Sequence, residues 1–305
     1  MPSSLRAPRE PDLPWPGPAV SVTVVIPTVD RVDLLRRCLR GLTGEDVLVV
    51  HDGDPGILAL LAETGIAGLQ IGERGVSAKR NAGWRAAATE WVAFTDDDCQ
   101  PAPGWVEAMT RVGSDLVAGP VLPHPQDQAE GRWARTVVST IPGLYPGCNL
   151  MVRRSALHGV GGFDEGLHGG EDTDLAWRVR ESGASHGWAE DALVWHAVRF
   201  VTFPEQLRSL RRWSGLPLVV RRHPQLRDLA HRRWFWKDTH PVALLALLGL
   251  LAAPKDRRAL VAVLPLLAVR VRTDGLRGGL QLAVNDAAET AVLLQGSMRH
   301  RSILL

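Results

Sequence analysis

The most unusual polar group of the sequence is a run of three aspartates, Asp96, Asp97 and Asp98. The run follows the apolar segment 91–95 and precedes prolines at 101 and 103, which favours a rigid edge over a loose acidic loop. Adjacent carboxylates repel one another, and a divalent cation that prefers oxygen ligands, Mg²⁺ or Mn²⁺, relieves the repulsion. Residues i and i+2 of an extended segment point the same way, so Asp96 and Asp98 can converge on one ligand. The alternative for an acidic run is a solvated turn.

A second acidic group, Glu171 and Asp172, follows Gly169 and Gly170 at a predicted helix start. Helix capping is one interpretation, because acids in a first turn accept backbone N–H groups and interact favourably with the helix dipole. The other interpretation is general-base catalysis, in which a carboxylate takes the proton of an attacking hydroxyl. Asp172 and Asp174 are the two candidates for the base, and Asp174 could instead orient or cap the helix.

A histidine, His196, ends the apolar segment 192–196. It is a candidate metal ligand, and the alternative is a half-buried histidine hydrogen-bonded to the backbone. Mixed Asp and His coordination suits Mn²⁺ at least as well as Mg²⁺. The sequence has neither a Walker lysine loop nor a G-x-G-x-x-G segment after its first predicted strand. Metal and arginines would therefore have to balance the charge of a bound diphosphate.

The elements that must position these residues alternate between strand and helix in the first third of the chain. β-Branched runs predict strands, and apolar residues at helical spacing predict the helices between them. This alternation predicts an α/β fold with a mostly parallel sheet, whose ligands sit beyond the carboxyl ends of the strands. We expect strands over 20–30, 46–54, 68–72 and 91–95, and helices over 31–42, 55–66 and 77–90. The polar segments Pro27–Arg31, His51–Asp54 and Asp96–Asp98 all lie at such ends.

The second half of the chain begins with a long loop, residues 119–147, which is rich in proline and glycine. We expect a strand entering a short helix over 148–157, and a strand over 191–198. Between them, a glycine-rich loop leads into a helix with Leu175, Ala176 and Val179 on its apolar side. After residue 198 the pattern is helical to the end.

The net charge of +2 hides an asymmetry. Residues 199–305 contain 18 Lys+Arg and 7 Asp+Glu, a balance of +11, which leaves −9 for residues 1–198. A basic C-terminal part can meet nucleic acid or an anionic membrane face. It carries no nucleic-acid motif, so we expect no nucleic acid and prefer peripheral membrane contact through 201–305. A solvated basic helical surface is the alternative.

Two apolar runs, 241–253 and 259–269, lie in this basic part. Neither is long enough to span a hydrocarbon core of about 30 Å, which takes roughly 20 helical residues. We expect a helical hairpin, either packed on the body of the protein or dipping into one leaflet.

Residues 1–20 contain no apolar run before Ala19, so they do not resemble a signal peptide and are predicted to be a flexible lead-in. Cys38, Cys99 and Cys148 lack paired spacing, which indicates a reducing compartment. We expect a cytoplasmic protein, located at the cytoplasmic face of the plasma membrane if the C-terminal part makes contact there.

Six segments, in order from about Val22 to Val198, resemble the motifs of family 2 glycosyltransferases with the GT-A fold. The segments are VTVVIPTVDR, VVHDGD, RGVSAKRNAGW, FTDDDCQP, GCNLMVRRSAL and GGFDEGLHGGEDTDLAWRV. The resemblance implies a GT-A catalytic domain over 21–200, followed by a basic helical extension over 201–305. His51 departs from the family pattern, which has an acid there, and leaves the choice between uracil and guanine open.

The resemblance also implies roles for individual residues. Asp52 would hydrogen-bond the nucleobase, Arg80 would lie near the base or the phosphates, and Asp96 would contact ribose or metal. Asp98 would bind the metal, with His196 as a further ligand. The end of the first strand would contact the nucleotide-sugar through Pro27, Thr28 and Asp30.

Asp97 is grouped with the nucleotide-sugar contacts, and a supporting hydrogen bond to a neighbouring loop is its alternative role. Asp172 would be the general base. The acceptor region would include Asn149, Glu171 and Trp177.

These roles imply a Mn²⁺- or Mg²⁺-dependent, inverting glycosyltransferase. It would move a sugar from a nucleotide-diphosphate donor to a hydroxyl of a carbohydrate or lipid-linked acceptor. We expect it to act in cell-envelope polysaccharide or glycolipid synthesis. One alternative is a nucleotidyltransferase on a similar fold, which would need a Gly-rich basic loop after the first strand. The other is a non-catalytic membrane-associated scaffold, which the acids Asp96, Asp98 and Asp172 argue against.

Overall fold

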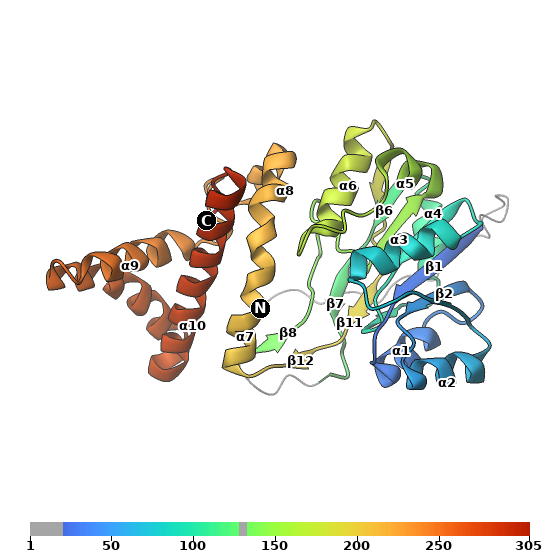
Figure 1. Ribbon diagram of the computed structural model, residues 1–305, viewed down its shortest axis with the longest axis horizontal. Helices are drawn as coiled ribbons and strands as arrows, with labels where there is room; N and C mark the ends of the chain where they lie inside the picture. The colour runs from blue at the N-terminus through green and yellow to red at the C-terminus, as the bar shows by residue number, and fades with distance from the viewer. Residues whose placement is uncertain (1–20, 128–132) are drawn as a thin grey trace. The chain divides into compact units, whose positions relative to one another are not determined.

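The computed structural model describes residues 21–127 and 133–305 (Figure 1). Contacts between residues divide the chain into two compact units. The first contains the described residues up to His124, Val137–Gly162 and Val179–His196, and the second contains Pro125–Thr136, Phe163–Arg178 and Ala197–Leu305. The sequence suggested one boundary near residue 200, whereas the second unit also includes two segments that precede it, Pro125–Thr136 and Phe163–Arg178. The predicted lead-in, residues 1–20, lies outside the described residues.

The first unit is built on a seven-stranded sheet in the order β10-β6-β9-β4-β1-β2-β3. Its strands are β1 Val22–Pro27, β2 Asp46–His51, β3 Ala67–Gln70, β4 Trp91–Phe94, β6 Leu116–Ala118, β9 Leu150–Arg153 and β10 His186–Trp188. Neighbours pair in parallel except at β9, which runs antiparallel between β4 and β6. The predicted α/β alternation and mostly parallel sheet are confirmed.

The centre of this sheet is fully buried. All six residues of β1 are buried, and its run of Val and Ile is typical of a parallel strand that is covered on both faces. The covering helices are α1 Val32–Arg40, α2 Pro55–Thr64, α3 Val76–Ala86, α4 Trp105–Arg111 and α5 Arg154–Val160.

Helix α3 packs directly on β1 and β2. The approach is closest at Gly83, where an added Cβ would lie 2.3 Å from Cγ1 of Val25. Only glycine allows a backbone to come so near a neighbouring side chain. Lys79, one turn earlier on the same face of α3, is thereby brought to the carboxyl ends of these strands.

A smaller three-stranded sheet in the first unit has the order β5-β11-β7. It contains β5 Cys99–Pro101, β11 Val194–His196 and β7 Val121–Pro123. β11 runs antiparallel to β5, with His196 opposite Cys99, and parallel to β7. β7 falls in the segment predicted to be a loop, because its order comes from pairing with a strand more than 70 residues later rather than from its own sequence.

The second unit is mainly helical. After a two-stranded antiparallel ladder, β8 Ala134–Arg135 with β12 Arg199–Phe200, come α-helices (α) and 3₁₀-helices (η). They are α7 Phe203–Ser209, η1 Leu210–Gly215, α8 Leu216–Arg222, η2 Pro224–Leu229, α9 His240–Ala252, η3 Arg257–Val263 and α10 Leu264–His300. The prediction of helix throughout this region is thus wrong at β12, which is extended because it pairs with β8.

The two apolar runs of the C-terminal part form the predicted hairpin. α9 contains the first run, and the second is divided between η3 and α10, both of which pack against α9. α10 is two helices joined at a kink, since Gly275 within it has φ of 70°. Within the described ranges, no helix combines the length and the apolar character needed to cross a membrane.

Candidate active site

Most of the predicted donor-side residues gather at one edge of the large sheet in the first unit. Thr28 follows β1, Asp52 follows β2, and Asp96 and Asp97 come directly after β4 and Thr95. β1, β2 and β4 are adjacent and parallel, so their carboxyl ends open on the same side. The sequence therefore predicted this gathering correctly.

Asp97 lies at the centre of the edge and is completely buried. Its carboxylate accepts a hydrogen bond of 2.7 Å from the Thr28 hydroxyl. It also accepts hydrogen bonds from Nε of Arg31, at 3.2 Å, and from Nη2 of the same guanidinium. Burial raises the pKa of Asp97 to about 6, although Arg31 and Thr28 act in the opposite direction.

These contacts correct the grouping of Asp97 with the nucleotide-sugar contacts. A carboxylate without exposed surface, held by Thr28 and Arg31, joins the turn after β4 to the loop after β1. This is the supporting hydrogen bond to a neighbouring loop that the sequence offered as the alternative. Asp97 thus fixes the positions of the aspartates on either side of it.

Three other carboxylates at this edge are also paired with a cation, and one of them, Asp98, shares Arg31 with Asp97. Asp96 accepts a 2.6 Å hydrogen bond from Nη2 of Arg80, a buried residue of α3. Asp98 accepts one of 2.5 Å from Nη1 of Arg31. The third carboxylate, Asp52, is paired with Lys79.

Lys79 connects Asp52 to the end of β1. Its side chain is only 2% exposed, and Nζ donates to the Thr28 carbonyl at 2.6 Å and to Asp52 at 3.2 Å. Burying an ammonium group is costly unless it is paired and hydrogen-bonded, and both conditions are met here. Next to this pair, His51 is buried and its Nδ1 accepts a hydrogen bond from the Gly53 amide, while burial lowers its pKa. A neutral imidazole therefore stands where the family pattern has an acid.

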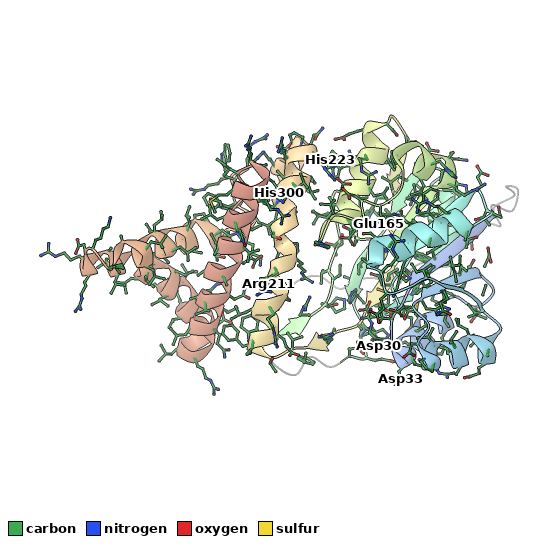
Figure 2. All side chains as sticks on the ribbon, viewed as in Figure 1. Asp30, Asp33, Glu165, Arg211, His223 and His300 are labelled. Atoms are coloured by element: carbon green, nitrogen blue, oxygen red, sulfur yellow. The ribbon has the colours of Figure 1, made fainter. Side chains whose placement is uncertain are left out.

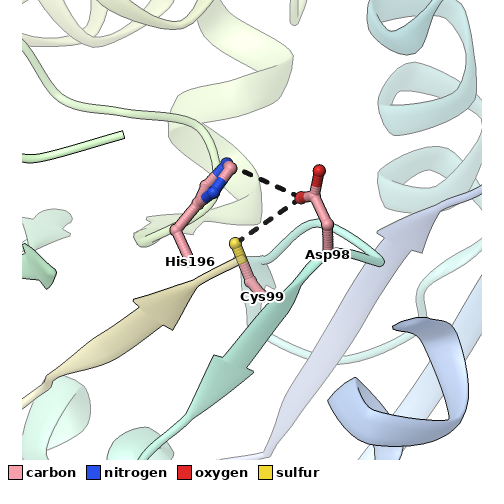
Figure 3. A group of neighbouring side chains, drawn as sticks. All are labelled: Asp98, Cys99 and His196. Atoms are coloured by element: carbon pink, nitrogen blue, oxygen red, sulfur yellow. Dashed lines mark hydrogen bonds and ion pairs between the residues drawn. The ribbon is translucent and has the colours of Figure 1, made fainter. Parts of the chain in front are cut away.

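One group of side chains in the described ranges has metal-ligating geometry: Asp98, Cys99 and His196, with ligand atoms within 4.8 Å of one another. Figure 3 shows the Asp98 carboxylate facing both partners. Oδ1 lies 3.6 Å from Nε2 of His196 and 3.9 Å from Sγ of Cys99. His196 reaches Asp98 because β11 pairs with β5 in the register His196–Cys99.

The chemistry of this group fits a divalent cation held by Asp98 and His196. Both side chains are partly accessible, at 17% and 14%, so open coordination positions would face solvent or substrate. Burial raises the pKa of the Cys99 thiol well above its usual value, so a thiolate ligand is disfavoured. Asp96 is not part of this group of candidate ligands, and its carboxylate is paired with Arg80. Of the two roles expected for Asp96, ribose contact agrees better with this geometry than metal binding.

Two of the residues expected at the end of the first strand differ in accessibility. Pro27 is buried within β1, whereas Asp30 is exposed in the turn before α1, where Figure 2 labels it near Asp33. Asp30 can therefore meet a ligand directly. Pro27 and Thr28 are buried and support this edge of the sheet.

Asn149 does not line an acceptor region, which corrects its predicted role. The side chain has no exposed surface, and Nδ2 donates to the carbonyls of Pro120 and Ala192 at 2.8 Å each. Oδ1 accepts a 2.8 Å hydrogen bond from the indole of Trp105. With these groups satisfied inside the core, Asn149 connects the segments just before β7 and β11 to the start of α4.

The predicted general base, Asp172, lies in the second unit, at the start of helix α6 Glu171–Glu181. Asp172 and Glu171 are both partly accessible. Oδ1 of Asp172 accepts a 2.7 Å hydrogen bond from the Thr173 amide, a local contact of the kind expected at a helix start. The contact leaves the carboxylate accessible, so the capping and catalytic interpretations are compatible.

Asp174, the other candidate base, is completely buried in an ion-pair network of the second unit. It accepts hydrogen bonds from Nε of Arg178 at 2.8 Å and Nη1 of Arg222 at 2.9 Å, and Nε2 of His223 lies 3.4 Å away. Burial alone would raise its pKa, but hydrogen bonds from His223, Arg222 and Arg178 hold the pKa well below its usual value. A carboxylate so inaccessible and so weakly basic is not a general base, which leaves Asp172.

We expect Asp174→Asn to lower the free energy of unfolding by about 3 kcal/mol at neutral pH, because it removes the buried carboxylate that pairs with Arg178, Arg222 and the buried His223. The pKa of Asp174 is lower in the folded than in the unfolded chain, so its stabilising effect is complete above about pH 4. The effect is lost as the pH falls through the folded-state pKa. Urea unfolding should therefore show a constant difference between variant and wild type from about pH 8 to pH 5, and a smaller one below about pH 4.

The control for this prediction is Asp164→Asn. Asp164 shares Arg222, at 2.8 Å, but is 33% exposed, so its loss should cost less than about 1 kcal/mol. An Asp174→Asn variant as stable as the wild type at neutral pH would contradict the importance of the network.

Trp177, expected in the acceptor region, is half-buried on α6. Its ring lies 6.2 Å from the ring of His223, and it packs against an apolar cluster of the second unit. The cluster contains Leu167, Leu216, Val219, Val220, Leu226, Ala230, Leu293 and Leu304. Trp177 therefore has a clear packing role, and stacking on an acceptor sugar stays a prediction.

Comparison with known families now identifies the chain. Residues 23–163 match the model of Glycosyl transferase family 2, and residues 133–272 match that of Glycosyl transferase family group 2. The chain belongs to glycosyltransferase family 2. The resemblance stated from the motifs is confirmed.

Individual relatives of this family 2 chain agree. It is 32% identical over 238 residues to the pre-mycofactocin glycosyltransferase of Mycobacterium tuberculosis, covering 67% of this chain and 48% of that protein. It is 27% identical over 211 residues to glycosyltransferase AglE of Haloferax volcanii, covering 58% of this chain and 67% of that protein. The chain thus spans about half the length of its mycobacterial relative.

Among solved structures, the mannosyltransferase PcManGT of Pyrobaculum calidifontis, in complex with GDP-Man and Mn²⁺, superposes with a TM-score of 0.57. The match covers 95% of this chain and 90% of that one, at 19% identity. The likeness confirms the predicted GT-A fold.

Two basic residues of the site were not singled out by the family 2 motifs. Arg31 pairs with both Asp97 and Asp98, and Lys79 pairs with Asp52. Arg31 ends the polar segment after the first strand, and Lys79 lies four residues before Gly83 on the packed face of α3. A basic residue at a strand end, or one on a buried helix face, is the signal that could have identified them.

Proposed function

We propose that this chain is a divalent-metal-dependent glycosyltransferase. It would transfer a sugar from a nucleotide-diphosphate donor to a hydroxyl of a carbohydrate or lipid-linked acceptor, with inversion at the anomeric carbon. The observation that carries the proposal is the edge where Asp52, Asp96 and Asp98 each have a cation and where His196 faces Asp98. In a family 2 fold, such a set of carboxylates and cations can bind the base, the ribose and the metal–diphosphate of a donor.

On the donor side, Asp52 would accept N–H hydrogen bonds from the nucleobase while Lys79 keeps it oriented. Asp96, held by Arg80, would accept a hydroxyl of the ribose, and Arg80 itself would lie near the diphosphate. These side chains are fixed by buried partners before the donor arrives, so little ordering cost remains for binding.

Asp98 and His196 would hold Mn²⁺ or Mg²⁺, which when bound neutralises charge on the departing nucleoside diphosphate. Nη1 of Arg31 donates a hydrogen bond to Oδ2 of Asp98. The Arg31 side chain is 40% exposed, so it can turn toward solvent or phosphate when a metal binds. PcManGT was solved with a nucleotide-sugar and Mn²⁺. We propose the same class of ligands for this chain.

On the acceptor side, Asp172 would take the proton of the acceptor hydroxyl as that oxygen forms its bond to the anomeric carbon. The bond from the anomeric carbon to the diphosphate oxygen breaks with its electron pair leaving on the diphosphate. Attack from the face opposite the leaving group inverts the configuration. Glu171 lies beside Asp172 in the first turn of α6 and Trp177 lies in the second turn, and both would contact the acceptor.

We place the reaction in the synthesis of cell-envelope polysaccharide or glycolipid, at the cytoplasmic face of the plasma membrane. The basic C-terminal part supports this assignment through its charge of +11. A panel of acceptors would include pre-mycofactocin, on which the Mycobacterium tuberculosis relative acts according to its name.

The proposal is tested by a thermal-shift screen of UDP-, GDP- and dTDP-sugars with and without Mn²⁺. A ligand present at about 100 times its Kd stabilises the folded state by about 2.7 kcal/mol. We therefore expect one donor class to raise Tm by several degrees, more so with Mn²⁺. If none of the donors raises Tm but a nucleoside triphosphate does, the chain is a nucleotidyltransferase instead.

Lys79→Met should weaken donor binding about tenfold, because Asp52 loses the buried ammonium that orients it. The expected result is a higher donor Kd by calorimetry, with the transfer rate at saturating donor nearly unchanged. Lys255→Met, which removes an exposed lysine, serves as the control and should not change Kd. An unchanged Kd in Lys79→Met would contradict the role of the Lys79–Asp52 pair in donor binding.

A further inference from the structure

The hairpin of the second unit presents large apolar side chains to its surroundings. On α9, Leu248 is 54% exposed, Leu250 is 50% exposed and Leu251 is 77% exposed. We define the apolar face as the large exposed hydrophobic residues of α9, η3 and the first turn of α10: Leu245, Leu248, Leu250, Leu251, Leu260, Val261 and Leu264. So many neighbouring exposed leucines and valines mark an interaction surface rather than an ordinary solvated one.

The side of α9 that packs inward carries small residues. Ala243, Ala246 and Gly249 are buried, while four of the six leucines of the helix, Leu245, Leu248, Leu250 and Leu251, are exposed. An added Cβ on Gly249 would lie 2.6 Å from Cβ of Ala262, so the backbones of α9 and η3 are close together. A helix on the surface of a water-soluble protein has the opposite arrangement, because it buries its large apolar residues. Small residues between helices and large ones outside are the pattern of helices in lipid.

The turn that joins α9 to η3, together with the first two residues of η3, is basic. Lys255, Arg257 and Arg258 are all exposed there, and we call these three residues the basic turn. The acid among them, Asp256, uses its side chain to cap η3 by accepting a 2.9 Å hydrogen bond from the Arg258 amide. Three cations next to exposed leucines match the headgroup region of an anionic bilayer, where each basic residue contributes about 1 kcal/mol.

The other end of the hairpin is polar and firmly held. Arg270 donates to both oxygens of buried Asp286, at 2.6 and 2.9 Å, and Lys237 donates to buried Glu289 at 2.6 Å. These ion pairs, together with the small core of Ala243, Ala246, Leu266 and Ala283, fix the hairpin to the part of α10 that follows its kink at Gly275. The exposed leucines therefore stand on a supported element and not on a loose tail.

The dimensions of the hairpin limit how it can meet a bilayer. α9 has 13 residues and is about 20 Å long, shorter than a hydrocarbon core of about 30 Å. A short apolar hairpin with a basic turn is suited to lie within one leaflet, with its cations at the phosphates.

We propose that the apolar face and the basic turn dock the protein in one leaflet of a bilayer that contains anionic lipid. An anionic bilayer matches both parts of this surface, because its acyl chains can accept the exposed leucines and its headgroups carry the negative charge that complements the basic turn. The inference rests on the proposed function in one respect: it places the transferase where a lipid-linked acceptor would be. The docking itself requires neither donor nor acceptor.

The test is flotation of the full chain with vesicles, without donor. Vesicles of phosphatidylcholine with about 30% phosphatidylglycerol resemble an anionic membrane surface, and vesicles of phosphatidylcholine alone are the neutral comparison. We expect the wild type to float with the anionic vesicles. Leu248→Ser combined with Leu251→Ser should lower partitioning at least about 100-fold, since burial of each leucine is worth about tenfold or more. Leu58→Ser, which changes a leucine of α2 that is 44% exposed, is the matched control and should float like the wild type.

The basic turn is tested by the triple variant Lys255→Gln, Arg257→Gln and Arg258→Gln. We expect about 100-fold weaker partitioning to anionic vesicles, at about 1 kcal/mol per charge, and little change with neutral ones. Equal losses on both kinds of vesicle would contradict the electrostatic part of the proposal.

The depth of insertion can be read from a fluorophore attached to Leu251→Cys, because the three native cysteines are buried and should react slowly. Lipids brominated on their acyl chains should quench this label but not one attached to Glu63→Cys, an exposed position of the first unit.

Three results would overturn the proposal: a wild type that does not float with anionic vesicles, serine variants that float equally well, or a label at position 251 that is not quenched. If the serine variants also convert a dimer to a monomer in light scattering while flotation is unchanged, the face belongs to a second copy. Failure of sugar transfer with normal flotation would instead contradict only the proposed function.

Discussion

Asp98→Asn is expected to abolish Mn²⁺-dependent sugar transfer, lowering kcat by about 1,000-fold or more. The substitution replaces a charged oxygen ligand that faces His196 by a neutral amide, and a loss of about 4 kcal/mol in transition-state stabilisation corresponds to this factor. The measurement is the initial rate of transfer over a titration of Mn²⁺, together with Mn²⁺ binding in the presence of donor. Sugar transfer and Mn²⁺ binding should be lost together.

The control is Asp33→Asn, which removes an exposed carboxylate in the first turn of α1 at the same end of the sheet. It should retain nearly full activity and normal Mn²⁺ binding. If Asp98→Asn kept the wild-type dependence on Mn²⁺, the assignment of the metal to Asp98 and His196 would be wrong. Arg31 would then be the permanent partner of Asp98, and the pair would be structural.

Asp172→Asn is expected to abolish turnover while leaving donor binding nearly intact. A general base contributes about 100- to 10,000-fold to a proton transfer, and Asn cannot accept the proton of the acceptor hydroxyl. The predicted signature is therefore a kcat lowered by about 1,000-fold with an unchanged Kd for the nucleotide-sugar. Single-turnover transfer and calorimetry measure the two quantities separately.

Glu171→Gln provides a matched comparison, because it removes one negative charge from the same turn of α6. The loss of a favourable dipole interaction costs at most about 1 kcal/mol, so this variant should keep activity within about tenfold. Donor binding lost in Asp172→Asn would show that the residue mainly supports the helix start, as a capping residue does.

The local sequence was sufficient for the elements and for the edge on which the site is built. Continuous β-branched runs such as β1 and apolar residues at helical spacing are short-range signals, and they gave the alternation of strands and helices. In a parallel sheet all carboxyl ends open on one side, so Asp52 and Asp96–Asp98 could be placed together without coordinates.

Residue types alone could not predict which role each of the neighbouring acids has. Asp96, Asp97 and Asp98 are chemically identical, yet one is paired with Arg80, one is buried between Thr28 and Arg31, and one faces His196. Likewise, Asp172 and Asp174 are two residues apart on α6 and have opposite accessibility. These differences come from partners that are distant in sequence.

The sequence by itself determined the α/β class, the GT-A resemblance, the site edge and the short apolar hairpin. The tertiary structure alone decided that Asp97 and Asp174 are buried among hydrogen-bonding partners, that Asn149 belongs to the core, and that four leucines of α9 are exposed. The physical reason is the range of the forces concerned. Periodicity and strand polarity are properties of adjacent residues, whereas burial, ion pairing and the choice of an exposed face depend on contacts that form only when distant segments pack.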